Sequence, residues 1–211
     1  MIIAVDGPSA SGKGSVSRRL AAHFGLPYLD TGVLYRAVAR DMIDQGLPLD
    51  DAEAAARAAR NVNLQALDDA RLRERYMGEA ASRVAALPDV RQALLEVQRA
   101  FAHRSGGAVL DGRDIGTVVC PDADVKLYIT ASAEARAQRR FEELRALGED
   151  VEAEEVHQDI LKRDRRDQER STAPLRKADD AHLLDTTNLD IEQAFKAALG
   201  LINAAHVPKR S

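Results

Sequence analysis

The sequence predicts an α/β fold in which one parallel β-sheet lies between layers of helices. Short apolar runs alternate along the chain with longer segments of helical periodicity, which is the pattern of a parallel sheet wrapped by helices. The chain has 211 residues, enough for one α/β domain but not for a second full core. We therefore expect a single domain spanning residues 1–211.

Five short apolar runs have the length and composition of buried strands. The first precedes a glycine-rich turn, and the others follow at irregular intervals. The predicted strands are Ile2–Val5, Pro27–Leu29, Ala108–Leu110, Val125–Thr130 and His182–Leu184.

Helices are predicted between these strands from apolar spacing and from capping residues. The first, near 13–24, has a four-residue apolar repeat and ends at Gly25. Asp89 and Ser132 are predicted N-caps, whereas Gly46 and Gly148 are predicted to end helices. The other predicted helices lie near 33–45, 52–60, 69–86, 90–103, 133–147, 153–166 and 191–204.

Two intervals between strands are much longer than a βαβ crossover requires. The interval between the second and third strands is helical and rich in alanine, and that between the fourth and fifth is strongly charged. We expect both to cover the carboxyl edge of the sheet, where open α/β folds bind ligands. The first insertion is predicted at about 36–104 and the second, a lid, at about 145–172.

The composition excludes several classes of function. The formal net charge of −4 argues against non-specific nucleic-acid binding. No run of residues is long and apolar enough to span a membrane, and the N-terminus predicts a strand rather than a signal peptide. Cys120 is the only cysteine, so neither an intrachain disulfide nor a thiolate zinc site is possible. We expect a cytoplasmic, monomeric enzyme.

The loop after the first strand has the pattern of a phosphate-binding loop. It has the form G-x-x-x-x-G-K, and it lies between an apolar strand and a helix, the context that this motif requires. Glycines let successive N–H groups face a phosphate, and Lys13 adds a positive charge beside the N-terminal end of a helix. Ser15 is the hydroxyl expected near Mg²⁺. The predicted ATP-binding residues are Gly7, Pro8, Ser9, Ala10, Ser11, Gly12, Lys13, Gly14 and Ser15.

Three further groups of residues predict a second, anionic substrate. Thr31 is expected to cap a helix that carries Arg36, which would hold a phosphate. Asp111 follows the third strand, where a carboxylate commonly orients water bound to Mg²⁺. Arg113 and Asp114 come directly after it.

The third group is a charged stretch in the second insertion. Its arginines Arg163, Arg166 and Arg170 are spaced so that they share one helix face. Such a row is repulsive unless it meets an anion, as a mobile lid over a triphosphate would provide. A solvated helix face with alternating charge is the competing interpretation.

Taken together, these motifs resemble those of bacterial cytidylate kinases, which are nucleoside monophosphate kinases with a P-loop. The similarity runs from the glycine-rich loop through Asp30–Arg36 and Gly112–Val119 to Arg163–Ser171, nearly the whole chain. It implies a three-layer P-loop NTPase fold with a five-stranded parallel sheet, a helical monophosphate-binding insertion and a lid. The implied reaction transfers a phosphoryl group from ATP to CMP, with dCMP also accepted and with Mg²⁺ as cofactor.

The resemblance also implies roles for individual residues. Ser82, Arg91 and Asp114 would read the cytosine, and Arg163 and Asp167 would hold the sugar. Lys13, Arg113, Arg163 and Arg170 would be catalytic, and Ser15 and Asp111 would serve the metal, through water. The residues expected at the monophosphate are Thr31, Arg36, Arg113 and Arg170.

The sequence departs from this family in one region and leaves two alternatives open. Many cytidylate kinases have a longer insertion with a small antiparallel sheet, whereas residues 61–88 here predict one continuous helix. Thr31 stands where serine is frequent. The alternatives are another small-molecule kinase, for UMP or a non-nucleotide acid, and a non-catalytic module that senses ATP.

Overall fold

The computed structural model describes residues 1–67 and 70–206 and contains one parallel sheet of strand order β2-β3-β1-β4-β5. All five predicted strands are confirmed, and each boundary is correct to within two residues. The register places Asp30 of β2 beside Asp111 of β3. The strands are β1 (Ile2–Asp6), β2 (Tyr28–Asp30), β3 (Ala108–Gly112), β4 (Val125–Thr130) and β5 (His182–Asp185).

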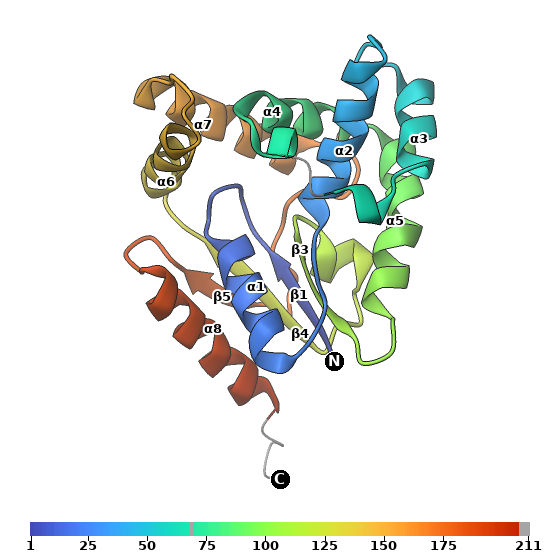
Figure 1. Cartoon of the computed structure of the whole chain (residues 1–211). Helices are drawn as coiled ribbons and strands as arrows, with labels where there is room; N and C mark the ends of the chain where they lie inside the picture. Colours follow the sequence, from blue (N-terminus) through green and yellow to red (C-terminus); the bar gives the residue numbers. More distant parts are fainter. Residues whose placement is uncertain (68–69, 207–211) are drawn as a thin grey trace.

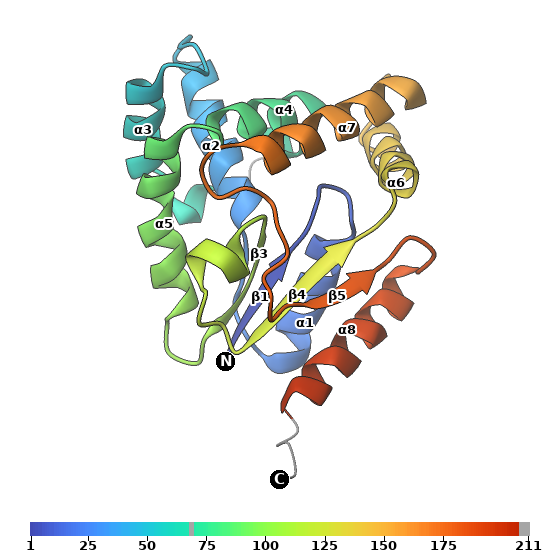
Figure 2. The ribbon, with the colours of Figure 1, turned by 180° about the vertical axis from the view of Figure 1, so that it is seen from behind.

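Alternate side chains of the strands pack into two cores, one on each face of the sheet. Ile3 and Val5 of β1 face α1 (Lys13–Phe24) and α8 (Ile191–His206), whereas Ala4 faces the opposite core. The second core contains α5 (Pro88–Ala102) and residues of the first insertion. The predicted three-layer architecture is therefore confirmed (Figures 1 and 2).

Both long insertions lie at the carboxyl ends of the strands, as expected (Figure 1). Helices α4, α6 and α7 lie above the sheet in both views (Figures 1 and 2). No helix within the described part of the chain is long and apolar enough to cross a membrane. Besides α5, the helices in the two long intervals are α2 (Thr31–Asp44), α3 (Ala52–Arg60), α4 (Arg75–Val84), α6 (Ala133–Ala146) and α7 (Ala153–Glu169).

The prediction of one continuous helix near 69–86 is wrong, although its first residue lies outside the described residues. A 3₁₀ turn covers Ala70–Arg73, Glu74 is extended, and α4 begins at Arg75. Met77 and Leu72 are both buried, but on one continuous helix they would lie about 140° apart. The break at Glu74 lets both side chains reach the core. Between residues 61 and 88, the described residues contain no strand.

The capping predictions had mixed outcomes. Ser132 caps α6, because its hydroxyl accepts a hydrogen bond from the Ala135 N–H. Asp89 does not cap α5, which starts one residue earlier at Pro88, the residue type favoured at the first helical position. Gly46 and Gly148 follow α2 and α6 with positive φ, as predicted.

Candidate functional site

The loop between β1 and α1 has a backbone that only glycine permits at two positions. Gly7 has φ of +152°, and a Cβ there would lie 1.9 Å from the carbonyl oxygen of Ile129. Gly12 has φ of +84° and precedes the first residue of α1. Since α1 begins at Lys13, the loop leads directly into the positive end of that helix.

Neighbouring segments hold the loop through its carbonyl oxygens. The Thr186 hydroxyl donates to the Ser11 carbonyl at 2.9 Å, and Lys13 Nζ donates to the Pro8 carbonyl at 3.2 Å. The side-chain hydroxyls of Ser9 and Ser11 are buried and make no hydrogen bond. The loop therefore has a fixed shape and unused hydrogen-bonding groups.

The Lys13 ammonium is buried at the base of this loop. Burial is the main cause that lowers its pKa to about 7, and the nearby charge of Arg113 is the second. The carboxylates of Asp111 and Asp30 act in the opposite direction but do not compensate. An anion bound beside Lys13 would restore its charge.

Two carboxylates lie side by side at the ends of β2 and β3. Burial and the nearby Asp30 carboxylate raise the pKa of Asp111 to about 6, and the Tyr28 hydroxyl donates to Asp111 at 2.9 Å. Burial would raise the pKa of Asp30, but Arg36, which donates to it at 2.6 Å, and Lys13 lower it. Both carboxylates border a cavity of about 190 Å³.

Thr31 does not cap α2, contrary to the prediction. Its hydroxyl donates to the carbonyl oxygen of Asp111 at 2.7 Å, and the N-cap residue is Asp30. Thr31 is itself the first residue of the helix, so its hydroxyl ties the start of α2 to the end of β3. The side chain remains at the edge of the sheet where it was expected.

Six cationic side chains line the same cavity. Arg75 and Arg140 pair with Glu155 and Glu143, and the other four come from separate segments. Lys13 comes from the loop, Arg36 from α2, Arg113 from the segment after β3, and Arg163 from α7. The pKa of Arg163 is lowered to about 10, mainly by burial and secondly by the charge of Arg113. Repulsion among these groups means that an anion in the cavity would be stabilised by all four.

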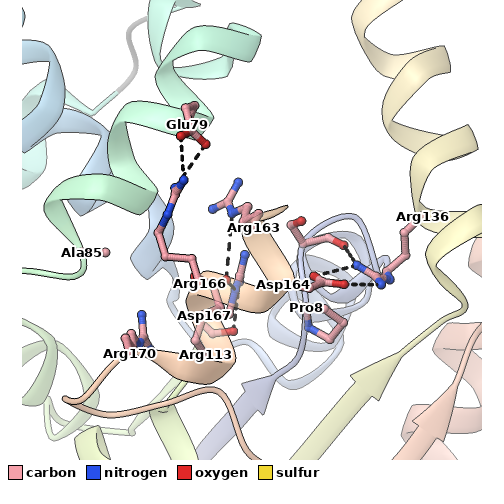
Figure 3. Close-up of polar contacts among 12 residues, drawn as sticks. Pro8, Glu79, Ala85, Arg113, Arg136, Arg163, Asp164, Arg166, Asp167 and Arg170 are labelled. Carbon is pink, nitrogen blue, oxygen red and sulfur yellow. Dashed lines mark hydrogen bonds and ion pairs between the residues drawn. The ribbon is translucent and has the colours of Figure 1, made fainter. Parts of the chain in front are cut away.

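Asp167 of α7 links two of these cations (Figure 3). Arg113 Nε donates to it at 2.9 Å, and Arg163 Nε lies 4.0 Å from the same carboxylate oxygen. Burial would raise the pKa of Asp167, but Arg113 and Arg163 lower it. The Nε atom of Arg163 makes no hydrogen bond, so this arginine retains donors for a ligand.

A second cluster surrounds Asp114, away from the cavity lining. Arg91 donates a hydrogen bond to Asp114, and the guanidinium of Arg91 lies 5.5 Å from the centre of the Tyr35 ring. Arg170 Nη2 lies 3.8 Å from Asp114. Ser82 of α4 is buried, and its hydroxyl makes no hydrogen bond.

The predicted row of three arginines does not converge on one point. Arg163 faces the cavity, and Arg170, the C-cap residue that follows α7, lies at the Asp114 cluster. Arg166 instead pairs with Glu79 of α4 (Figure 3). Residues at this spacing share a broad helix face, but these three side chains end in different surroundings.

The structure reveals a buried carboxylate that sequence reasoning missed. Asp6, the last residue of β1, accepts hydrogen bonds from the backbone N–H groups of Ile115 and Gly116, both at 2.7 Å. Burial raises its pKa to about 7, although these two hydrogen bonds lower it. An acidic residue at the end of an apolar strand, directly before Gly7, is the signal that could have indicated it.

The oxygen groups near the loop are chemically suited to Mg²⁺. A Cβ on Gly14 would make a tight contact of 3.3 Å with Asp111 Oδ2, so the glycine leaves space between the loop and this carboxylate. Ser15 is exposed in the first turn of α1. Among the described residues no cluster of three or more acidic, histidine or cysteine side chains could hold a metal by itself. Mg²⁺ usually takes one or two carboxylates, water and substrate phosphates, and Asp111 and Ser15 would offer a carboxylate and a hydroxyl.

Comparison with known families identifies one match along almost the whole chain. Residues 3–204 match the family described as cytidylate kinase. A cytidylate kinase of Methylocella silvestris is 63% identical over 206 residues, covering 98% of this chain and 95% of that protein. One of Rhizobium meliloti is 56% identical over 204 residues, covering 97% and 96%.

Solved structures with low sequence identity share the fold. A sugar kinase of Janibacter superposes with a TM-score of 0.51 at 17% identity, covering 99% of both chains. A gluconokinase of Sinorhizobium meliloti has a TM-score of 0.50 at 17% identity, covering 96% of this chain and 91% of that one. At such identity the likeness concerns the fold alone.

Proposed function

Because the chain belongs to the cytidylate kinase family, we propose that it transfers the γ-phosphoryl group of ATP to CMP, giving ADP and CDP. We propose that dCMP is accepted as well. The observation that carries this proposal most strongly is the cavity where Lys13, Arg36, Arg113 and Arg163 meet, between the glycine-rich loop and the second insertion. It is a site for two phosphate groups brought together by four cations.

ATP is the proposed ligand of residues Gly7–Ser15. Backbone N–H groups of the loop and the start of α1 would bind the β- and γ-phosphates, and Lys13 would neutralise them. Mg²⁺, held by the ATP phosphates with Ser15 and water near Asp111, would neutralise further charge on the triphosphate.

The acceptor phosphate of CMP would lie on the opposite side of the cavity. Arg36 and Arg113 would hold it, with the Thr31 hydroxyl nearby at the start of α2. A phosphate monoester loses its second proton with a pKa of about 6, so its oxygen is already a nucleophile at neutral pH. No general base is needed. The new P–O bond forms as the bond between the γ-phosphorus and the leaving oxygen of ADP breaks.

The Asp114 cluster is the proposed site of the cytosine. Asp114 can accept from the exocyclic amine, and Arg91 can donate to the ring acceptors. Without a ligand these two groups pair with each other, so a base that offers both a donor and an acceptor can replace that pair without a loss of hydrogen bonds. Uracil would instead direct a carbonyl oxygen at Asp114. The unpartnered Ser82 hydroxyl is a third candidate contact.

The second insertion would supply charge stabilisation during transfer. Arg163 and Lys13 both line the cavity in which negative charge would move between the two phosphates. Asp167 keeps Arg113 and Arg163 side by side and lies where the sugar is expected. Arg170, beside Asp114, is proposed to act on the CMP side. Enclosure by α7 also keeps water away from the transferred group.

The test is ADP production from ATP and Mg²⁺ with CMP, dCMP, UMP and AMP in parallel reactions. We expect rapid turnover with CMP and dCMP and little with UMP or AMP. Equal turnover of CMP and UMP would retain the kinase and reject the proposed base contacts. Binding of ATP without transfer to any monophosphate would favour the ATP-sensing alternative.

A further inference from the structure

The two insertions meet above the cavity through charged side chains. Helix α4 belongs to the first insertion and α7 to the second, and they lie side by side in both views (Figures 1 and 2). Arg75 of α4 pairs with Glu155 at 2.9 Å and with Asp159 at 2.7 Å. The backbone N–H of Arg75 also donates to Glu149, just before α7, at 3.0 Å.

Glu79 makes a second group of contacts across this interface. Its carboxylate accepts from both terminal nitrogens of Arg166, at 2.8 and 3.2 Å (Figure 3). Lys162 Nζ lies 3.6 Å from the same carboxylate. The hydrogen bond from Arg166 is the main cause that lowers the pKa of Glu79, so Glu79 is ionised at neutral pH.

Gly78, the residue before Glu79, lies directly against Arg163. A Cβ on Gly78 would lie 3.5 Å from Arg163 Nη1, so the Arg163 guanidinium rests against the backbone of α4. Arg166 is less than one helical turn after Arg163 on α7. Glu79 therefore holds α7 at a point less than one turn from Arg163, the arginine that lines the cavity.

Arg163 has little else to hold it in this position. Its Nε makes no hydrogen bond, and its ion pair with Asp167 is long, at 4.0 Å. The neighbouring Arg113 and Arg36 repel it. Because these contacts are weak, the position of Arg163 depends on the contacts that hold α7 against α4.

We propose that Glu79 is a positioning residue for phosphoryl transfer. Through Arg166 and Lys162 it holds α7 against α4, and this contact keeps Arg163 directed at the transferred group. This inference rests on the proposed function. It means that an acidic residue of the first insertion controls the position of an arginine in the second insertion.

The test combines Glu79→Gln, Arg166→Gln and the double variant in the CMP-dependent assay. We expect each single variant to lower kcat about tenfold with KM for ATP and CMP changed less than about twofold, because a misplaced group weakens the transition state. The double variant should be no slower than either single variant, since all three remove the same contact. The charge exchange Glu79→Arg with Arg166→Glu should recover most of kcat.

Glu53→Gln is the matched control, because it removes an exposed pair with Arg57 at 2.6 Å on α3. It should leave kcat unchanged. If Glu79→Gln keeps the wild-type kcat, or if the two single losses multiply in the double variant, the role of Glu79 is wrong while the proposed function stands. If the wild-type protein does not phosphorylate CMP, both are wrong.

Discussion

The proposed donor half and the proposed acceptor half of the site are held together in different ways. The donor loop is one contiguous segment, shaped by glycine conformations and by backbone carbonyls that accept hydrogen bonds at close range. The acceptor half draws charged groups from α2, α4, α5, α7 and the segment after β3, and ion pairs join them. The first arrangement is rigid and locally encoded, whereas the second exists only when distant segments come together.

The largest expected effect comes from removing the lysine of the glycine-rich loop. Lys13→Ala should lower CMP-dependent ADP production by more than about 10³-fold, because the lysine neutralises charge on the transferred group directly. The loop should remain folded, since Gly7 and the Thr186 contact to Ser11 do not involve the lysine charge.

Arg19→Ala is the control for Lys13→Ala on the same helix. Arg19 is partly exposed and pairs with Glu192 of α8, away from the cavity. It should retain nearly full activity. Wild-type turnover in Lys13→Ala would contradict the assignment of the loop, and loss of the circular dichroism of the fold would show a structural role instead.

A smaller effect is expected in the acceptor half, on selectivity. Asp114→Asn should reduce the preference for CMP over UMP by about 10- to 100-fold, since one well-placed base contact is worth about 1–3 kcal/mol. An amide can offer a donor to the uracil oxygen, which the carboxylate cannot. The measurement is kcat/KM for both nucleotides.

Asp122→Asn provides the comparison for the Asp114 variant. Asp122 is exposed and pairs with His103 at 3.4 Å, outside both parts of the site. Its selectivity should equal that of the wild type. If Asp114→Asn loses activity with CMP and UMP equally, Asp114 holds the segment in place rather than reading the base.

The same contrast explains what the sequence could and could not predict. The order of strand, loop and helix around Lys13 is written in adjacent residues, so the five strands and the loop were predicted from local pattern. The pairing of Arg166 with Glu79 joins residues 87 positions apart, and no local pattern encodes it. The Thr31 hydroxyl was likewise assigned to its own helix, although its partner is a carbonyl on β3.

The break before α4 shows a third limit of the sequence. Leu72 and Tyr76 fit a helical repeat, but Tyr76 is 56% exposed and Met77 occupies the core instead. A repeat of apolar residues does not reveal which of two neighbours is buried when the chain can bend between them. Only the packing of α4 against α2 decides this.

The lowered pKa of Lys13 predicts that ATP affinity falls about fivefold between about pH 7 and about pH 8. With a pKa of about 7 in the absence of ligand, Lys13 is mostly neutral at pH 8, and the bound triphosphate restores its proton. Binding with Mg²⁺ at about pH 8 should therefore take up close to one proton, and affinity should fall as pH rises above about 7.

Calorimetry at about pH 8, in two buffers with different ionisation enthalpies, measures this uptake. The Asp111 carboxylate, with its pKa raised to about 6, is already ionised there and adds no proton change. Lys13→Arg should bind ATP without uptake, because arginine stays charged throughout this range. Equal uptake in that variant would assign the proton to another group.

The smallest expected effect is a difference in salt sensitivity between the two halves of the site. The α4–α7 contacts are partly exposed ion pairs, each worth about 0.2–1 kcal/mol, and salt screens them. Raising the ionic strength from about 0.05 M to about 0.5 M should speed amide hydrogen exchange in α7 by about two- to threefold. Helix α1 should change little, because Val16 and Leu20 anchor it in an apolar core. Glu79→Gln should already exchange faster at low salt and respond less to added salt. An equal response of α1 and α7 would mean that charge does not hold the acceptor half together.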